Sequence, residues 1–114
     1  MVAKGSVPRR WDVGAADLPS GEMRLVSAGG RNMLVANIEE ALYAVDGTCS
    51  HEDWSLADGM LYDFDRSILC SLHGSRFDLA SGAVIDPPAT RPLRTYEVSV
   101  ESGRLMIEMA TDQP

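Results

Sequence analysis

Four side chains in this sequence could bind a transition metal, and they come in two pairs. Cys49 is followed two residues later by His51, Cys70 is followed three residues later by His73, and eighteen residues separate the pairs. The chain has two cysteines and two histidines in all, so none lies outside these pairs. Thiolates and neutral imidazoles are both good ligands for iron and zinc. The spacing therefore predicts one metal site built from two short loops.

Several roles compete for these residues. Two cysteines could form a disulfide, but a histidine near each cysteine favours metal binding in a reducing compartment. Isolated cysteines are often buried apolar side chains, and isolated histidines are usually ordinary surface or core groups. That explanation needs four coincidences here, one for each Cys and His. A structural zinc site uses the same donors, although zinc fingers usually group Cys with Cys and His with His. A [2Fe–2S] cluster needs two ligands for each iron, and two Cys with two His form the Rieske ligand set.

The segments that carry the two pairs resemble those of Rieske-type ferredoxins. They are residues 49–59 (CSHEDWSLADG) and 70–78 (CSLHGSRFD). The resemblance is closest to the small ferredoxin components of bacterial aromatic ring-hydroxylating dioxygenase systems of the biphenyl dioxygenase type. It covers almost the whole chain, including Pro87-Pro88 and the closing hairpin. It implies an all-β fold: an antiparallel Rieske-type β-sandwich, a single domain over residues 1–114, with a small cluster-binding subdomain at about residues 46–88.

The resemblance also implies a role for each matching residue. Cys49 and Cys70 would hold the buried iron of one [2Fe–2S] cluster per chain, and His51 and His73 would hold the outer iron. The side chains expected to surround the cluster without binding iron are Trp54, Ser75, Phe77, Pro87 and Pro88. The residues expected to dock on partners are His51, His73, Trp54, Leu72 and Pro88. In the alternative reading, Trp54, Leu72 and Phe77 are simply core residues and the prolines form a rigid turn.

The sequence differs from the high-potential Rieske proteins of respiratory and photosynthetic complexes. Those proteins have two further cysteines whose disulfide joins the two loops, and this chain has no cysteine to spare. Phe77 stands where they have a tyrosine that donates to a cysteine sulfur, whereas Ser75 matches a serine that donates to a bridging sulfide. They also have a membrane anchor. Apart from Ser75, these differences indicate a soluble carrier of low reduction potential.

The rest of the sequence predicts strands that bring the two loops together. Short apolar or alternating runs are separated by Gly, Pro, Asp and Ser, which is typical of an antiparallel sandwich or barrel. Alternation is clearest near the C-terminus, where Tyr96, Val98 and Val100 are expected on one face. No amphipathic helix is predicted, and residues 54–62 show no clear period. The expected strands are residues 6–13, 22–27, 31–38, 41–46, 67–70, 83–85, 95–101 and 104–108.

Composition limits the class of partner and the compartment. The net charge is −7, from 10 basic and 17 acidic residues, which does not suit a nucleic-acid-binding surface. It suits a carrier that docks on a basic patch of its partner, although solubility alone also explains an acidic surface. No apolar run is long enough to cross a bilayer, and the N-terminal segment lacks the apolar core of a signal peptide. We therefore expect a cytoplasmic protein.

These observations predict an electron carrier and not an enzyme. We expect it to pass single electrons from a flavin-containing NAD(P)H ferredoxin reductase to a terminal Rieske non-haem iron oxygenase in aromatic-compound degradation. The chain has no spare histidine for a mononuclear iron site, which excludes the oxygenase itself. Two alternatives stay open: the small Rieske-like subunit of an assimilatory nitrite reductase, and a zinc-stabilised binding module. An absorption spectrum separates the zinc module, which would be colourless, from the other two.

Overall fold

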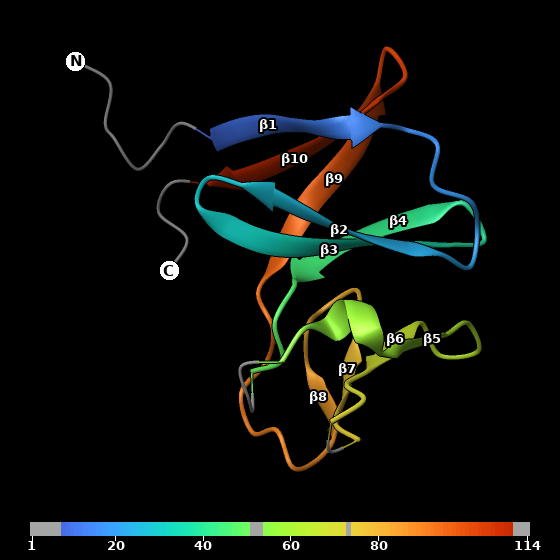
Figure 1. Ribbon diagram of the computed structural model, residues 1–114, viewed down its shortest axis with the longest axis vertical. Helices are drawn as coiled ribbons and strands as arrows, with labels where there is room; N and C mark the ends of the chain where they lie inside the picture. The colour runs from blue at the N-terminus through green and yellow to red at the C-terminus, as the bar shows by residue number, and fades with distance from the viewer. Residues whose placement is uncertain (1–7, 51–53, 73, 111–114) are drawn as a thin grey trace.

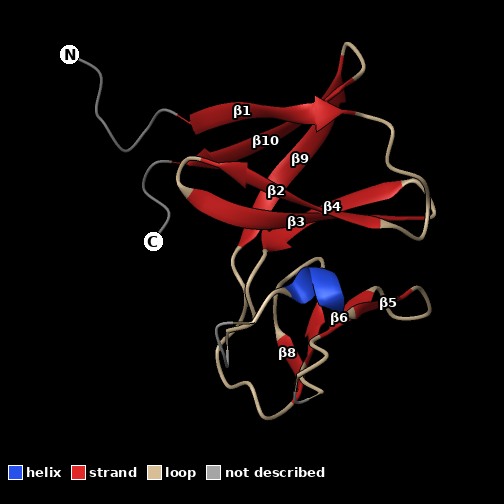
Figure 2. Cartoon of the chain, viewed as in Figure 1, coloured by secondary structure: helices blue, strands red, loops and turns tan. Residues whose placement is uncertain are grey.

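A computed structural model describes residues 8–50, 54–72 and 74–110 of the chain (Figure 1). The described residues form ten β-strands, one 3₁₀ turn and no α-helix, which confirms the predicted all-β antiparallel fold (Figure 2). The strands are β1 (Pro8–Ala15), β2 (Met23–Ala28), β3 (Arg31–Ile38), β4 (Ala41–Asp46), β5 (Met60–Tyr62), β6 (Ser67–Leu69), β7 (Arg76–Asp78), β8 (Val84–Asp86), β9 (Thr95–Glu101) and β10 (Arg104–Ala110), and the 3₁₀ turn is η2 (Leu56–Asp58).

Six strands form one antiparallel sheet in the order β1-β10-β9-β4-β3-β2. Its two edge strands, β1 and β2, contact each other, so the sheet curls toward closure (Figure 1). Curling of this kind protects the strand edges from pairing with another chain. β1 lies at an edge, as predicted for residues 6–13, and it begins at Pro8, which has no backbone donor to lose.

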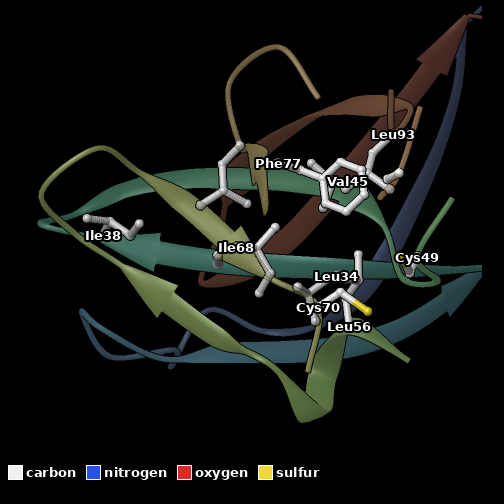
Figure 3. Packing of buried hydrophobic residues seen from close by; sticks show 12 residues of the cluster. Leu34, Ile38, Val45, Cys49, Leu56, Ile68, Cys70, Phe77 and Leu93 are labelled. Carbon is white, nitrogen blue, oxygen red and sulfur yellow. The ribbon is translucent and has the colours of Figure 1, made fainter. Parts of the chain in front are cut away.

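β3 separates two hydrophobic cores because it is buried on both faces. It ends in Met-Leu-Val-Ala-Asn-Ile, a nearly continuous apolar run of the kind found in strands covered on both sides. Met33 and Val35 belong to the first core, inside the curled sheet, and Leu34 and Ile38 belong to the second core, on the opposite face. Val45 of β4 lies opposite Leu34 and also belongs to the second core, which Figure 3 shows from close by.

The other four strands form a small antiparallel sheet in the order β5-β6-β7-β8, which lies below the curled sheet in Figure 1. Its Ile68 and Phe77 are part of the second core. After β7 the chain turns at Gly82, whose φ of +78° favours glycine. The Leu93 N–H donates to the Gly82 carbonyl oxygen at 2.8 Å, and a Cβ on Gly82 would lie 2.1 Å from the Leu93 carbonyl oxygen. A glycine here therefore lets the segment before β9 lie directly against the small sheet.

Each predicted strand has a counterpart among the described residues, with small shifts at the strand ends, and residues 6 and 7 of the first predicted strand lie outside the described part of the chain. The sequence does not predict β5, η2 or β7, each three residues long. Elements this short are stabilised by neighbouring strands and by the core, which a local pattern does not reveal. On β9, Tyr96 is buried and Val98 is half-buried, whereas Val100 is 52% exposed although its partner Leu105 on β10 is buried.

Candidate metal centre

β4 leads directly into the loop that carries the first cysteine, and its last residue fixes the base of that loop. The Asp46 carboxylate accepts hydrogen bonds from the Tyr96 hydroxyl at 2.6 Å and from the Arg94 backbone N–H at 2.9 Å. Burial, together with the neighbouring Asp46 carboxylate, raises the pKa of Tyr96 above its ordinary value, so the hydroxyl keeps the proton it donates. The first ligand loop thus starts from a fixed point on the curled sheet.

The two ligand loops are closed in the same way. The Cys49 N–H donates to the Trp54 carbonyl oxygen at 2.9 Å, and the Cys70 N–H donates to the Ser75 carbonyl oxygen at 2.8 Å. Each loop therefore opens with its cysteine and closes with a backbone hydrogen bond from that cysteine to the residue five positions later. The sequence does not predict this repeat, because the two segments are only loosely alike.

Both cysteine side chains are buried, with 5% of Cys49 and 2% of Cys70 exposed. Both belong to the second core, among otherwise apolar residues (Figure 3). A buried thiolate needs a positive partner, and a metal ion can supply it. The other two predicted ligands, His51 and His73, lie outside the described residues. Among the described residues no three His, Cys, Asp or Glu side chains gather as a metal site, so the structure describes the cysteine half of the predicted ligand set.

β6 and β7 place Cys70 on the same face as two residues predicted to surround the cluster. Ile68 lies opposite Phe77 in this strand pair, and the hydrogen bond from Cys70 to Ser75 continues the register. Side chains alternate along a strand, so Cys70, Ser75 and Phe77 share the face toward the second core, while Arg76 faces away. Phe77 and Ser75 are both buried, at 0% and 1% exposure.

The proline segment, residues 86–91, is held against the second ligand loop, residues 70–75. The buried Ala89 N–H donates to the hydroxyl oxygen of buried Ser75 at 3.0 Å. Pro87 and Pro88, joined by a cis peptide bond, are both exposed. Among the bonds between described residues, the Ser75 hydroxyl accepts this one and donates none. Its proton is therefore available to an acceptor in the predicted site.

Three of the predicted docking residues lie on the surface. Trp54 is 39% exposed and Leu72 is 37% exposed, and Pro88 is exposed. They come from the two ligand loops and the proline segment, toward the lower end of the molecule in Figure 1. Trp54 and Leu72 are therefore not core residues, whereas Phe77 is one. The remaining docking residues, His51 and His73, lie outside the described part of the chain.

A network of ion pairs on the outer face of the small sheet is a feature that the sequence does not predict. The Arg76 guanidinium donates to the carboxylates of Asp86 and Asp65, each at 2.6 Å, and to the Ser67 hydroxyl at 3.0 Å. The hydrogen bond from Ser67 and the neighbouring Arg76 hold the pKa of Asp65 below its usual range. Because Asp86 directly precedes Pro87, Arg76 ties the start of the proline segment to β7.

The donor set and its surroundings fit a [2Fe–2S] cluster of the Rieske type. Two buried cysteines, each followed closely by a histidine, supply two thiolates and two imidazoles, which are the ligands of such a cluster. A structural zinc ion accepts the same donors. The donor set alone therefore leaves both metals open.

Comparison with known proteins distinguishes these two possibilities. Residues 10–97 match the family model of the Rieske [2Fe–2S] domain. The ferredoxin component of the naphthalene 1,2-dioxygenase/salicylate 5-hydroxylase systems of Ralstonia sp. is 34% identical over 93 residues, which cover 82% of this chain and 88% of the relative. These matches span both ligand loops and the strands that carry them.

Solved structures agree with this assignment. The ferredoxin of carbazole 1,9a-dioxygenase from Nocardioides aromaticivorans IC177 aligns with a TM-score of 0.82 at 28% identity, covering 86% of this chain and 95% of that one. A chain in the complex of reduced oxygenase and oxidized ferredoxin in carbazole 1,9a-dioxygenase aligns with a TM-score of 0.80 at 32% identity, covering 92% and 95%. Since the family model covers most of the sequence, including both cysteine–histidine pairs, the chain belongs to the Rieske [2Fe–2S] domain family.

Proposed function

We propose that this protein is a one-electron carrier in which Cys49 and Cys70 hold the inner iron of a [2Fe–2S] cluster, and His51 and His73 hold the outer iron. The observation that carries the proposal is the arrangement of the two cysteines. Each opens a loop of the same closed form, and both are buried in one core. The bound cluster would accept and release one electron. The protein itself then catalyses no bond change.

The described residues would keep water away from the inner half of the site. Cys49 and Cys70 lie in a core with apolar neighbours that include Leu34, Leu56 and Phe77. A low-dielectric environment penalises additional negative charge, so this core would lower the reduction potential. The two imidazoles act in the opposite direction, because they reduce the negative charge of the ligand set compared with four thiolates.

An exposed apolar surface would serve for docking. Trp54, Leu72 and Pro88 supply it from three different segments. Transient redox complexes have small interfaces, so a few residues of this kind can dominate the contact. The net charge of −7 would favour a partner with a basic surface and would speed the encounter.

The partners that we propose are a flavin-containing NAD(P)H ferredoxin reductase as donor and a terminal Rieske non-haem iron oxygenase as acceptor. Relatives support this proposal: one is named as a ferredoxin component of dioxygenase and hydroxylase systems, and another is seen in a complex with an oxygenase. The aromatic compounds in these names differ, from naphthalene and salicylate to carbazole. We therefore propose aromatic compounds as a class for the substrate of the oxygenase.

We also propose a single Rieske domain over residues 1–114, with a cluster-binding subdomain at about residues 46–88. The small sheet and both cysteines lie within that segment, which supports these boundaries. No helix among the described residues has the length and apolar character needed to cross a bilayer. A cytoplasmic location stays our prediction from the sequence.

Electron transfer reconstituted from purified components tests the proposed function. A ferredoxin reductase of a dioxygenase system with NADH should bleach the visible spectrum of the oxidised protein. A terminal oxygenase with its aromatic substrate should then restore the spectrum and yield hydroxylated product. A protein that supports no oxygenase but is required by a nitrite reductase would belong to the first alternative. A colourless protein with stoichiometric zinc would be the binding module.

A further inference from the structure

The three segments around the predicted cluster are joined to one another by hydrogen bonds that involve side chains. Loop 1 is residues 49–54, loop 2 is residues 70–75, and the proline segment is residues 86–91. Each pair of segments shares at least one such bond. These bonds connect parts of the chain that are distant in sequence and that carry, or lie beside, the predicted ligands.

Trp54 joins loop 1 to loop 2. Its indole Nε1–H donates to the Ser71 hydroxyl oxygen at 3.0 Å. Trp54 is the last residue of loop 1, and Ser71 directly follows Cys70. The indole nitrogen can only donate, so this bond has a fixed direction. It spans the gap between the two loops at a point on the surface, where Trp54 and Ser71 are both exposed.

Arg91 joins loop 1 to the proline segment through a reciprocal pair of bonds. The Ser50 hydroxyl donates to the Arg91 carbonyl oxygen, and Arg91 Nη2–H donates to the Ser50 carbonyl oxygen at 3.1 Å. Ser50 lies between Cys49 and His51 in the sequence. Two bonds between one pair of residues fix an orientation as well as a distance, so Arg91 holds the backbone between two predicted ligands.

Loop 2 and the proline segment, the third pair of segments, are also joined by a hydrogen bond. The Ala89 N–H donates to the Ser75 hydroxyl oxygen at 3.0 Å. Just outside loop 2, Arg76 holds Asp86 at 2.6 Å. The sequence contains two cysteines, and the proposed function uses both as ligands, so no disulfide is available to join the segments. Between the described residues of these segments, the hydrogen bonds of Trp54, Arg91 and Ser75 are links that the structure shows.

We propose that the bonds of Trp54 with Ser71 and of Arg91 with Ser50 form a non-covalent clasp that holds the two ligand loops at the separation the cluster requires. Trp54 and Arg91 are then positioning residues, which act on the cluster through the loops. This inference rests on the proposed function. When one of these hydrogen bonds is missing, the two ligand loops separate more often and the cluster is released faster.

A double-mutant cycle on the holoprotein tests the clasp. Trp54→Phe keeps an aromatic ring but removes the donor, and Ser71→Ala removes the acceptor. The measurement is the rate at which the visible absorbance of the cluster decays in excess chelator. Since a single net hydrogen bond is at stake, each variant should lose its cluster about three- to tenfold faster than wild type. The double variant should lose it no faster than either single variant, because both remove the same bond.

The chain offers matched controls. Trp11→Phe, at the other tryptophan, on β1, and Ser99→Ala, at an exposed serine on β9, should leave the decay rate unchanged. The EPR spectrum of reduced Trp54→Phe should broaden, because the ligand loops then sample a wider range of separations. Equal decay rates in all variants would overturn the proposal. It would also be overturned if the accelerations of cluster decay in Trp54→Phe and Ser71→Ala multiplied in the double variant. A lowered unfolding midpoint with an unchanged EPR spectrum would overturn it as well.

Arg91 is tested in the same assay. Arg91→Lys keeps the charge but loses the planar guanidinium, so it should accelerate cluster loss severalfold. Arg94→Lys, an exposed arginine nearby whose backbone contacts Asp46, should not accelerate it. If Arg91→Lys behaves like wild type, Arg91 does not position loop 1. If wild-type protein holds no [2Fe–2S] cluster at all, the proposed function fails; a stable cluster that ignores all these changes removes the clasp alone.

Discussion

Phe77→Tyr should raise the reduction potential of the protein by several tens of millivolts. Phe77 shares a face with Cys70 and Ser75, and it lies two residue pairs further along the β6–β7 register, opposite Ile68. Diagonal neighbours of this kind are within reach of an aromatic side chain. A tyrosine hydroxyl here can therefore reach toward the Cys70 sulfur and donate a hydrogen bond to it. The Phe77 side chain has no donor.

The size of the effect follows from the change in charge. Reduction makes the site more negative, so a donor to a sulfur stabilises the reduced state more than the oxidised state. A hydrogen bond to a charged acceptor is worth roughly 1.5–3 kcal/mol, and only the difference between the two redox states changes the potential. If that difference is about 1–2 kcal/mol, at about 59 mV per tenfold for one electron, the potential rises by roughly 40–90 mV. The wild-type potential should lie near the low end of the Rieske range, about −150 mV.

Direct voltammetry of both proteins at one pH measures this change, and Phe77→Leu serves as the control that alters packing without adding a donor. Phe77 is fully buried in an apolar core, so a hydroxyl that finds no partner there costs about 1–3 kcal/mol of stability. A Phe77→Tyr protein with an intact cluster, a lowered unfolding midpoint and an equal or lower reduction potential would refute this prediction. That result would show that the hydroxyl does not reach a cluster sulfur.

Three further predictions concern the ligands, the docking surface and the base of loop 1. His73→Ala should abolish the Rieske EPR signal, and a reduced spectrum identical to wild type would remove His73 from the ligand set. Leu72→Asp should slow reduction of the oxygenase severalfold without changing the cluster spectrum. Val100→Asp, at an exposed residue of the curled sheet, should leave the reduction rate unchanged. Stopped-flow kinetics in which Val100→Asp slows the reduction and Leu72→Asp does not would contradict the docking surface. The pKa of Tyr96 is raised by burial and by Asp46, so its stabilising contribution is complete below the ordinary tyrosine pKa of about 10 and is lost as pH rises through the folded-state value. Tyr96→Phe should therefore flatten the decline of the thermal unfolding midpoint above about pH 10, and an equally steep decline in the variant would assign that decline to another group.

The sequence predicts the strands and turns well where the physical cause is local. The hairpin between β2 and β3 turns at Gly29 and Gly30, whose φ angles of +59° and +79° suit glycine. The apolar run of β3 predicts a strand, but it does not predict that Leu34 and Val35 belong to different cores. That separation depends on where the small sheet packs, which no local pattern contains.

In the candidate site, too, some features can be predicted from the sequence and others depend on the fold. The predicted ligand residues stand out in the sequence because Cys and His occur nowhere else in it. The contacts of Trp54 with Ser71 and of Arg76 with Asp86 are not visible, because tryptophan, serine and arginine are common on protein surfaces in other roles. These contacts arise only when the fold brings loop 1 against loop 2, and the proline segment against β7. The matching closure of the two loops is likewise a property of the backbone and not of residue type.

The most direct test of the central claim is the metal content of the purified protein together with the EPR spectrum of its reduced form. We expect two irons and two acid-labile sulfides per chain, and a spectrum with the low average g-value of a centre ligated by two Cys and two His. Stoichiometric zinc in a colourless protein would contradict this expectation. So would an iron–sulfur protein with the spectrum of an all-cysteine cluster, since His51 and His73 would then not be ligands.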